Sequence, residues 1–171
     1  MHYCAVCDGA FYEGKPVAVY GGGNSALQEA LLLSKTSCKV FLIYRGNKLK
    51  GEEVLIEKLK SAGNVDILTN TTIIELIGED KLDAIKLQDP LGERNLGISA
   101  LFIAIGHQPD NTNFENIVSL NQAGYIISSE CATSTSGLFV AGDCRTKDIR
   151  QLTTAIADGT VAALSAIKYI G

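Results

Sequence analysis

The sequence has no apolar stretch long enough to cross a lipid bilayer, which would need about 20 consecutive apolar residues. Its amino end, Met1-His2-Tyr3-Cys4, has neither a basic region nor an apolar core, so we expect no secretory signal there. Charge is balanced as well, because 15 basic and 19 acidic side chains give a net charge of −4 with no block of one sign. Nucleic-acid binding needs clustered Lys and Arg, so we expect neither a membrane nor a nucleic acid as a partner.

Histidines are few, and the cysteines do not suggest a disulfide framework. The histidines are His2 and His107, and the cysteines are Cys4, Cys7, Cys38, Cys131 and Cys144. An odd cysteine count with one close pair is unlike a secreted protein and fits a reducing compartment, so we expect a cytoplasmic protein. No second CxxC or CxxH accompanies the close pair, which disfavours a zinc site and predicts no metal. The other three cysteines are expected in the core, and His2 receives no role.

What remains is the composition of a globular protein. Hydrophobic residues make up 46% of the 171 residues and charged residues 20%. This length has room for one good-sized domain, or for one domain and a fragment of another.

The amino-terminal part alternates strands and helices. Strands are predicted at 16–20, 39–44 and 65–68, and helices at 26–34 and 52–62. Asn24 and Ser25 are expected to cap the first helix, and Val54, Leu55 and Leu59 to share the buried face of the second. The βαβαβ order predicts an α/β fold, a doubly wound Rossmann-like parallel sheet.

The following segments have a different character. Short stretches at 71–77, 82–87 and 94–98, joined by polar turns, predict an antiparallel β-meander laid over one face of the sheet. An apolar strand then returns at 100–105 and ends at Gly106.

A polar segment after Pro109 suggests a linker, so we predict two domains, 1–108 and 109–171. The second holds only a hairpin-like pair, 124–127 and 138–141, and a helix at about 151–169. So few elements cannot enclose a core, so we interpret this part as the carboxy-terminal half of a second α/β domain. Its uncovered apolar side chains, expected at Leu138, Val140, Ile156 and Val161, would favour self-association.

The motif Cys4-Ala5-Val6-Cys7-Asp8-Gly9 predicts thiol–disulfide chemistry. Two cysteines three apart can close a disulfide within one helical turn, and helix-terminal amides can hold one sulfur as thiolate. Such a pair passes two electrons by thiol–disulfide exchange. Asp8 follows directly, where its carboxyl group can give a proton to a departing thiolate.

The motif Gly21-Gly22-Gly23-Asn24-Ser25-Ala26 is a GxGxxA sequence between a predicted strand and a predicted helix. In that context the glycines permit a tight turn and let a pyrophosphate approach the helix amides. Where an NAD site usually has an acidic residue, this chain has Tyr44-Arg45-Gly46-Asn47-Lys48-Leu49-Lys50. Arg45, Lys48 and Lys50 offer positive charge to a 2′-phosphate, which favours NADPH over NADH.

A further apolar strand ends in Gly142-Asp143. An aspartate at a strand end can accept hydrogen bonds from a polyol, such as the ribityl chain of a flavin. A turn that simply needs Gly-Asp explains the same residues.

Together these stretches resemble the low-molecular-weight thioredoxin reductases over essentially the whole chain. The matching stretches are Tyr3-Cys4-Ala5-Val6-Cys7-Asp8-Gly9, 21–29, Phe102-Ile103-Ala104-Ile105-Gly106-His107-Gln108-Pro109, Gly142-Asp143-Cys144-Arg145 and Arg150-Gln151. The resemblance implies a thioredoxin-disulfide reductase that carries electrons from NADPH through FAD to thioredoxin, and a homodimer.

The resemblance also implies a role for each matching residue. Cys7 would take electrons from reduced FAD, Cys4 would attack the disulfide of thioredoxin, and Asp8 would act as acid and base. The nicotinamide cofactor would be bound by Gly21, Gly22, Gly23, Asn24, Ser25, Ala26, Glu29, Arg45, Lys50, Ile105 and Gly106. The carboxy-terminal half of the FAD site would comprise Gly142, Asp143, Arg150, Gln151 and Leu152.

The chain departs from the family pattern in two places. The family usually has His-Arg-Arg and a further Arg at the 2′-phosphate, where this chain has Tyr44, Arg45, Gly46 and Lys50. Lysine keeps the charge but lacks the planar guanidinium, so the preference for NADPH is expected to be relaxed. The amino-terminal FAD segment of the family should precede Cys4 and is absent, so we expect this chain alone to be inactive.

Three alternatives to this interpretation remain. The flavoprotein reductase of the alkyl hydroperoxide system has a similar carboxy-terminal half with a CxxC-Asp-Gly motif. A nicotinamide-binding module without turnover fits the absence of half of the FAD site. A ferredoxin-linked flavin reductase that has lost nicotinamide binding is disfavoured by the intact GxGxxA motif.

Overall fold

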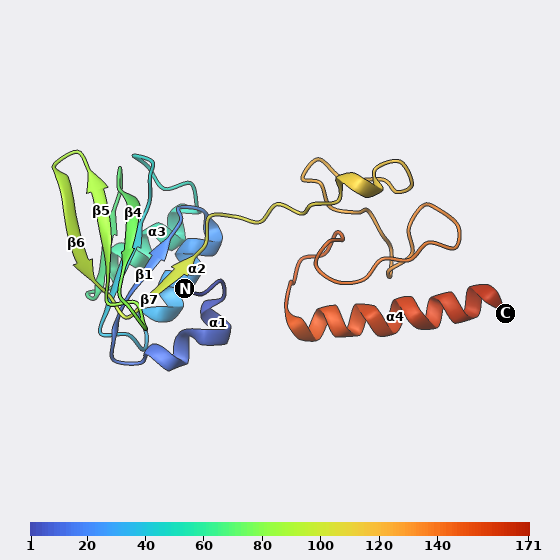
Figure 1. The fold of residues 1–171 in the computed structure, drawn as a ribbon, viewed down its shortest axis with the longest axis horizontal. Helices are drawn as coiled ribbons and strands as arrows, with labels where there is room; N and C mark the ends of the chain where they lie inside the picture. The colour runs from blue at the N-terminus through green and yellow to red at the C-terminus, as the bar shows by residue number, and fades with distance from the viewer. The chain divides into compact units, whose positions relative to one another are not determined.

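The computed structural model describes all 171 residues, which divide into two compact units, Met1–Gly106 and His107–Gly171 (Figure 1). None of the helices combines the length and the apolar content that a membrane crossing requires.

The first unit is built on a four-stranded parallel sheet. Its strands are β1 (Pro16–Tyr20), β2 (Lys39–Ile43), β3 (Val65–Leu68) and β7 (Ala100–Ile103), in the order β3-β2-β1-β7. Val17, Ala18 and Val19 of β1 have no exposed surface, as expected for a strand covered on both faces. The predicted α/β class with a parallel sheet is confirmed.

Two different layers cover the two faces of this sheet. Val17 and Val19 pack with the helices α2 (Asn24–Leu33) and α3 (Glu53–Ser61). Ala18, which points to the opposite face, packs instead with Ile85 and Leu87. These belong to the antiparallel sheet of β4 (Thr72–Ile77), β5 (Ala84–Asp89) and β6 (Gly92–Gly97), so the predicted meander over one face is confirmed.

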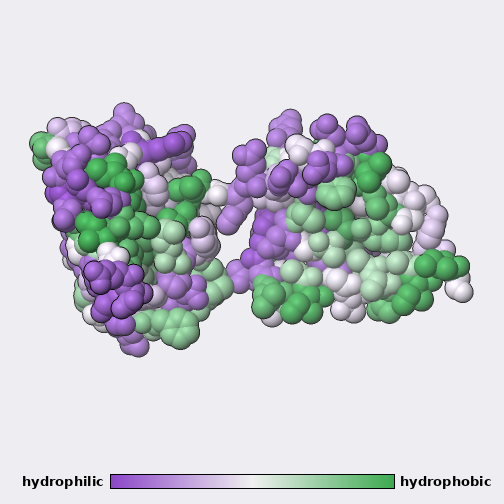
Figure 2. All heavy atoms as spheres, in the orientation of Figure 1, coloured by the Kyte–Doolittle hydropathy of each residue, from purple (hydrophilic) through white to green (hydrophobic).

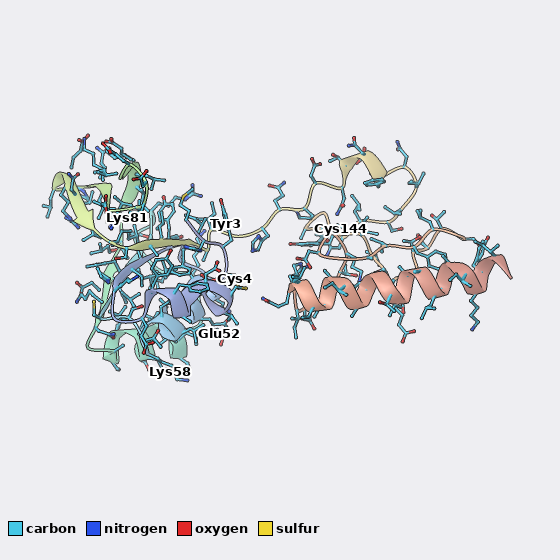
Figure 3. All side chains as sticks on the ribbon, turned by 60° about the horizontal axis from the view of Figure 1, so that its bottom comes forward. Tyr3, Cys4, Glu52, Lys58, Lys81 and Cys144 are labelled. Atoms are coloured by element: carbon cyan, nitrogen blue, oxygen red, sulfur yellow. A yellow bond between two sulfur atoms is a disulfide. The ribbon has the colours of Figure 1, made fainter.

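Tertiary contacts change some local details. Asn24 and Ser25 do not cap α2, whose N-cap is Gly23 with no side-chain hydrogen bond. Asn24 instead accepts a hydrogen bond from the Glu52 amide at 2.7 Å and donates one to the Glu52 carboxylate at 3.0 Å. Glu52, which is labelled in Figure 3, is the N-cap of α3. A partner from another element has therefore replaced the cap expected from local sequence.

Two burial predictions in the first unit are wrong. Val54 is 61% exposed, because the inward face of α3 carries Ile56 and Leu59, with Leu55 half-buried. Cys38 is exposed, because it lies outside the sheet, in the loop directly before β2.

The second unit contains little regular structure. Beyond a short 3₁₀ turn, η2 (Thr112–Phe114), it has one long helix, α4 (Leu152–Ile170). The expected pairing of 124–127 with 138–141 is absent: Ile126 bridges Leu120 and Arg145, while Phe139 bridges Ala132. Each strand-like segment therefore forms only single-residue bridges, because no neighbouring segment is long enough to form a β-ladder with it.

Apolar side chains lie exposed along α4 (Figure 2). They are Leu152, Ile156, Val161, Leu164, Ile167, Tyr169 and Ile170. The expectation of exposure is wrong for Val140, which is buried with Val118 and Ile126 in the small core of this unit, and Leu138 is half-buried beside them.

Candidate active site

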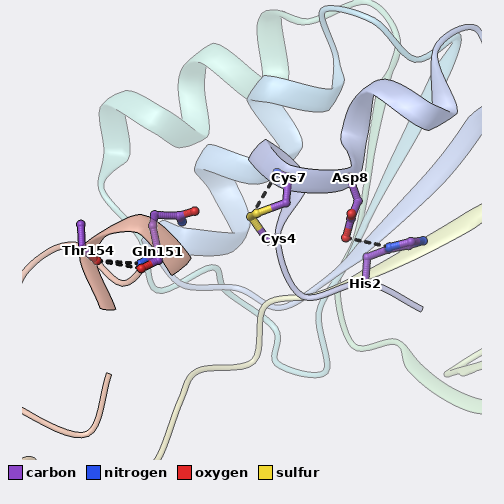
Figure 4. Close-up of a disulfide and its surroundings, with 6 residues drawn as sticks. All are labelled: His2, Cys4, Cys7, Asp8, Gln151 and Thr154. Atoms are coloured by element: carbon purple, nitrogen blue, oxygen red, sulfur yellow. Dashed lines mark hydrogen bonds and ion pairs between the residues drawn. A yellow bond between two sulfur atoms is a disulfide. The ribbon is translucent and has the colours of Figure 1, made fainter. Parts of the chain in front are cut away.

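The two close cysteines form a disulfide at the first turn of α1 (Ala5–Asp8), with their Cα atoms 5.3 Å apart (Figure 4). Cys4 is the N-cap of this turn, and the Cys7 backbone N–H donates to Cys4 Sγ at 3.1 Å. Once the disulfide is reduced, the same N–H can stabilise a thiolate on Cys4. Cys7 is exposed and Cys4 is half-buried. The pair is therefore placed for thiol–disulfide exchange with a reagent from outside the unit.

Asp8 takes part in a hydrogen-bond network that the sequence did not indicate. His2 Nδ1 lies 2.9 Å from Asp8 Oδ2, and His2 Nε2 lies 2.8 Å from the hydroxyl of Tyr12, which ends the 3₁₀ turn η1 (Gly9–Tyr12). The carboxylate of Asp8 is turned toward His2 (Figure 4). No local motif links residues six and ten positions apart, so only the folded chain reveals this network.

A cavity of about 380 Å³ lies at the carboxyl ends of the central strands. It is lined by Tyr20, Gly21, Gly23, Tyr44, Arg45, Lys50 and Ile105. Its volume suits a cofactor, and the carboxyl edge of a parallel sheet, where the strand order reverses, is the usual place for one. A larger cavity of about 720 Å³, near Lys15 and Asp83, lacks the glycine turn and the helix start that this one has.

The glycines of the GxGxxA motif meet different demands. A Cβ on Gly21 would lie 2.2 Å from the Ala104 carbonyl oxygen and 2.9 Å from the Ala26 Cβ, and Gly21 has φ +156°. A Cβ on Gly22 would enter the ring of Tyr44. A Cβ on Gly23 would meet no atom within 4 Å, although Gly23 lines the cavity at the start of α2. The fold therefore requires the first two glycines and leaves the third facing open space.

The cavity carries positive charge. Arg45 and Lys50 line it, and the Lys50 backbone N–H donates to the Gly22 carbonyl at 2.7 Å, which holds this loop against the glycine turn. Lys48 is exposed and does not line the cavity. Two cations beside the N-terminus of a ten-residue helix suit a phosphorylated ligand, and the space at Gly23 suits close approach of a pyrophosphate.

Other residues predicted at this site lie around the cavity or away from it. Gly106 has φ +104° and follows Ile105, which is 68% exposed, and Ser25 is exposed on α2. Glu29 does not line the cavity and lies against α1, where it accepts a hydrogen bond from the Ala5 backbone. Burial raises the pKa of Glu29 above its ordinary value, and the Ala5 bond partly opposes this shift.

In the second unit, Gly142 and Asp143 lie in a loop that is tied to α4. Asp158 of α4 accepts hydrogen bonds from Arg145 at 2.7 and 2.8 Å, from Lys147 at 2.9 Å and from the Gly142 amide at 3.1 Å. Hydrogen bonds from Arg145 hold the pKa of Asp158 far below its usual range, with burial opposing and Lys147 and Gly142 assisting. Sequence reasoning missed Asp158, whose partners lie 11 to 16 positions earlier.

This arrangement leaves the side chain of Asp143 facing solvent. The side chain is 54% exposed and makes one long ion pair, with its Oδ1 3.8 Å from Lys147 Nζ. Arg150 stacks over the ring of Tyr125, with its guanidinium carbon 4.1 Å from the ring centroid. Gln151 caps α4 with Thr154 in a capping box, and Leu152 is 78% exposed. The loop and the helix start thus present an acceptor, a guanidinium and an apolar group that suit part of a polyol-bearing ligand.

Comparison with known proteins identifies relatives of the whole chain. Residues 1–159 match the family described as pyridine nucleotide-disulphide oxidoreductase. The thioredoxin reductase of Mycoplasma genitalium is 43% identical over 168 residues, which cover 96% of this chain and 53% of the relative. The thioredoxin reductase of Bacillus subtilis is 38% identical over 174 residues, covering 99% of this chain and 55% of the relative.

Solved structures give the same result. The crystal structure of thioredoxin reductase from Streptococcus pyogenes superposes with a TM-score of 0.92 at 32% identity, covering 98% of this chain and 56% of that one. Thioredoxin reductase from T. acidophilum follows with a TM-score of 0.69 at 31% identity, covering 98% and 56%. The chain therefore spans about half the length of the curated relatives and solved structures that it matches.

Proposed function

The chain belongs to the pyridine nucleotide-disulphide oxidoreductase family, and from this premise we propose that it is the dithiol-bearing and nicotinamide-binding part of a thioredoxin-disulfide reductase. The observation that carries the proposal is the Cys4–Cys7 disulfide in the same unit as a cationic, glycine-lined cavity. Relatives at 38–43% identity that are named thioredoxin reductases support it.

The dithiol performs the exchange with the protein substrate. In the reduced state Cys4 attacks the disulfide of thioredoxin and forms a mixed disulfide, and Cys7 then displaces the reduced substrate and re-forms the Cys4–Cys7 bond. The Cys7 amide stabilises the attacking thiolate, and Asp8 carries the proton between the sulfurs and solvent. Two electrons leave the dithiol in each cycle.

NADPH is the proposed electron donor. Its pyrophosphate would lie at Gly21, Gly23 and the first amides of α2, and its 2′-phosphate beside Arg45 and Lys50. Asn24 supports this cradle through Glu52, and Ala26 packs against Gly21. Because no acidic residue lines the cavity, a ribose diol has no specific acceptor there, which supports NADPH over NADH.

FAD is the second proposed cofactor, held in part by Gly142, Asp143, Arg150, Gln151 and Leu152. Bound FAD would supply the two-electron relay between nicotinamide and disulfide. Asp143 would accept hydrogen bonds from ribityl hydroxyls, and Arg150 would act as a cationic donor. The matched relatives are about twice as long as this chain, so we propose that it does not turn over alone, and that the complete protein is a cytoplasmic homodimer.

Nicotinamide titration of the chain tests the binding part of the proposal. NADPH is expected to bind more tightly than NADH, and Arg45→Ala to weaken NADPH binding by about tenfold through loss of one phosphate contact. The matched control is Lys48→Ala, which removes an exposed cation beside the cavity and should leave the affinity within about twofold. Equal losses in both variants, or equal affinity for NADPH and NADH, would contradict this assignment.

Visible absorbance tests the electron path. The chain is mixed with FAD under anaerobic conditions, separated from free flavin, and recorded before and after NADPH is added. We expect no retained flavin, and we expect the complete protein to reduce thioredoxin with NADPH and to lose this activity in Cys4→Ser. Bleaching of flavin retained by the chain would show that the chain alone is sufficient.

A further inference from the structure

Two hydrogen bonds join the start of α2 to the residue that precedes α3. Asn24 Oδ1 accepts from the Glu52 backbone N–H at 2.7 Å, and Asn24 Nδ2 donates to Glu52 Oε1 at 3.0 Å. The two residues are 28 positions apart in the chain, and both are exposed. Neither of them lines the cationic cavity, so this pair, which we name the Asn24–Glu52 latch, can affect a ligand there only through other residues.

The latch closes the segment of chain that carries Lys50. The Lys50 backbone N–H donates to the Gly22 carbonyl at 2.7 Å. The next residue, Gly51, runs so close to α2 that a Cβ there would lie 2.2 Å from Leu27 Cδ1 and 2.9 Å from Asn24 Oδ1. Three successive residues, from Lys50 to the end of the latch, are therefore held by the glycine turn and by α2. The position of Lys50 depends on these contacts.

Arg45, the other cation of the cavity, is held in a different way. It lies between two residues whose carbonyls are bonded to the segment after β3. The Tyr44 carbonyl accepts from the Thr71 amide at 3.1 Å, and the Gly46 carbonyl accepts from the Asn70 amide at 2.9 Å. The two cations that line one cavity are therefore positioned by separate sets of hydrogen bonds, and only one set includes the latch.

We propose that Glu52 is a positioning residue for Lys50: through Asn24 it holds the Lys50 segment against the glycine turn, and so helps the site to distinguish a 2′-phosphate from a ribose hydroxyl. This inference rests on the proposed function, because it requires NADPH to bind in the cavity. A cation that is already in place loses less conformational freedom when a phosphate binds, so more of its attraction contributes to affinity. Glu52 itself contacts no ligand.

The charge of Glu52 gives the test a clear sign. A carboxylate near a phosphate site repels an anionic ligand, so its removal alone would strengthen NADPH binding. Loss of the latch has the opposite effect. We expect Glu52→Ala to lower the ratio of NADPH affinity to NADH affinity by about threefold, in keeping with the loss of one exposed hydrogen bond. Glu52→Gln keeps an oxygen that can accept from Asn24, so it should not lower the ratio.

Titration of the 171-residue chain with NADPH and with NADH measures this ratio in single and double variants. Because the latch acts through Lys50, Glu52→Ala should have no further effect on the ratio in a Lys50→Ala background. In an Arg45→Ala background it should keep its full effect, since the position of Arg45 does not depend on the latch. The matched control is Glu53→Ala, which removes the next exposed carboxylate in the chain and should not lower the ratio.

Amide hydrogen exchange of the chain without nucleotide tests the latch directly. The Lys50 amide should exchange faster in Asn24→Ala, which removes both bonds of the latch, and at the wild-type rate in Glu53→Ala. Thermal unfolding of each variant confirms that the fold is intact. The proposal is wrong if exchange at Lys50 is unchanged in Asn24→Ala, if Glu52→Ala raises the affinity ratio, or if Glu52→Ala lowers it equally with and without Lys50.

These outcomes are separate from failure of the proposed function. A wild-type chain that binds no NADPH would refute the nicotinamide site and, with it, the role of Glu52. A wild-type chain that binds NADPH, combined with any of the contrary results for the variants, would refute only the role of Glu52.

Discussion

Gly21 and Gly23 belong to one motif, but the structure constrains the two positions differently. Gly21 is closed in by the Ala104 carbonyl and the Ala26 side chain, and it has a positive φ. Gly23 has φ −95°, which other residues adopt, and open space where a Cβ would lie. The first glycine is therefore a requirement of folding, and we propose that the third is a requirement of the nicotinamide ligand.

Alanine substitutions should separate these two requirements. Gly21→Ala should lower the free energy of unfolding by about 2 kcal/mol, because the new methyl group overlaps a carbonyl oxygen. Gly23→Ala should change stability by less than about 1 kcal/mol but weaken NADPH binding at least tenfold, because the methyl group occupies the space of the pyrophosphate. Urea denaturation and nucleotide titration measure the two effects. A stable Gly21→Ala variant, or full affinity in Gly23→Ala, would contradict this division.

At the scale of single residues, the sequence predicted some features and not others. The CxxC spacing was sufficient to predict the disulfide, since both sulfurs lie within one turn of chain. His2 carried no local signal, because it meets Asp8 only once the chain has folded and His2 pairs with Phe102 of β7. The start of β2 agrees with the prediction, and the exposure of Cys38 just before it depends on the packing of the preceding loop, which periodicity does not describe.

Among the elements, α4 and the preceding loop depend on one another. Asp158 is buried in α4 and accepts hydrogen bonds from Arg145, Lys147 and Gly142 of that loop. The loop has no regular structure of its own, so these bonds hold the Gly142-Asp143 turn beside the helix start. Replacing Asp158 would leave the cations Arg145 and Lys147 without their counter-ion.

Asp158→Asn should therefore destabilise the second unit by about 3 kcal/mol at pH 7. The folded-state pKa of Asp158 is lowered, while an unfolded aspartate titrates near its ordinary pKa of about 3.9. The stabilisation is thus fully present above that pH and is lost as the pH falls below it toward the folded-state value. The difference between wild type and variant should narrow below about pH 4 in urea unfolding followed by helical circular dichroism.

Asp148→Asn is the control for this experiment, because Asp148 is exposed and makes no ion pair. It changes the net charge by the same amount and should leave the unfolding curve in place. Equal stability of Asp158→Asn and wild type at pH 7 would show that the cluster does not hold the loop.

At the scale of the whole molecule, the chain comprises two units with separate cores. The segment between them, from Ile105 to Gln108, is exposed at every residue. Exposed connecting backbone outside regular structure is where proteases cut first. The first unit has two sheets and two packed helices, whereas the second has one helix and a small core.

Limited digestion with subtilisin should therefore cut first between Ile105 and Asp110. The expected stable product is the first unit, and the second should be degraded next because fewer buried apolar contacts protect it. Mass spectrometry of the fragments over time measures both steps. Initial cleavage inside the meander, or survival of the second unit alone, would contradict this expectation.

The sequence by itself determined the α/β class, the parallel sheet, the meander, the disulfide and the glycine turn. Each of these follows from periodicity or from spacing within a few residues, where local geometry decides the outcome. Tertiary structure decided the rest. It gave Asn24 a partner on α3, left the strand-like segments of the second unit without a ladder, buried Asp158 among its cations and brought His2 to Asp8. Those contacts join residues from different elements, and their formation depends on which surfaces pack together once the chain has folded.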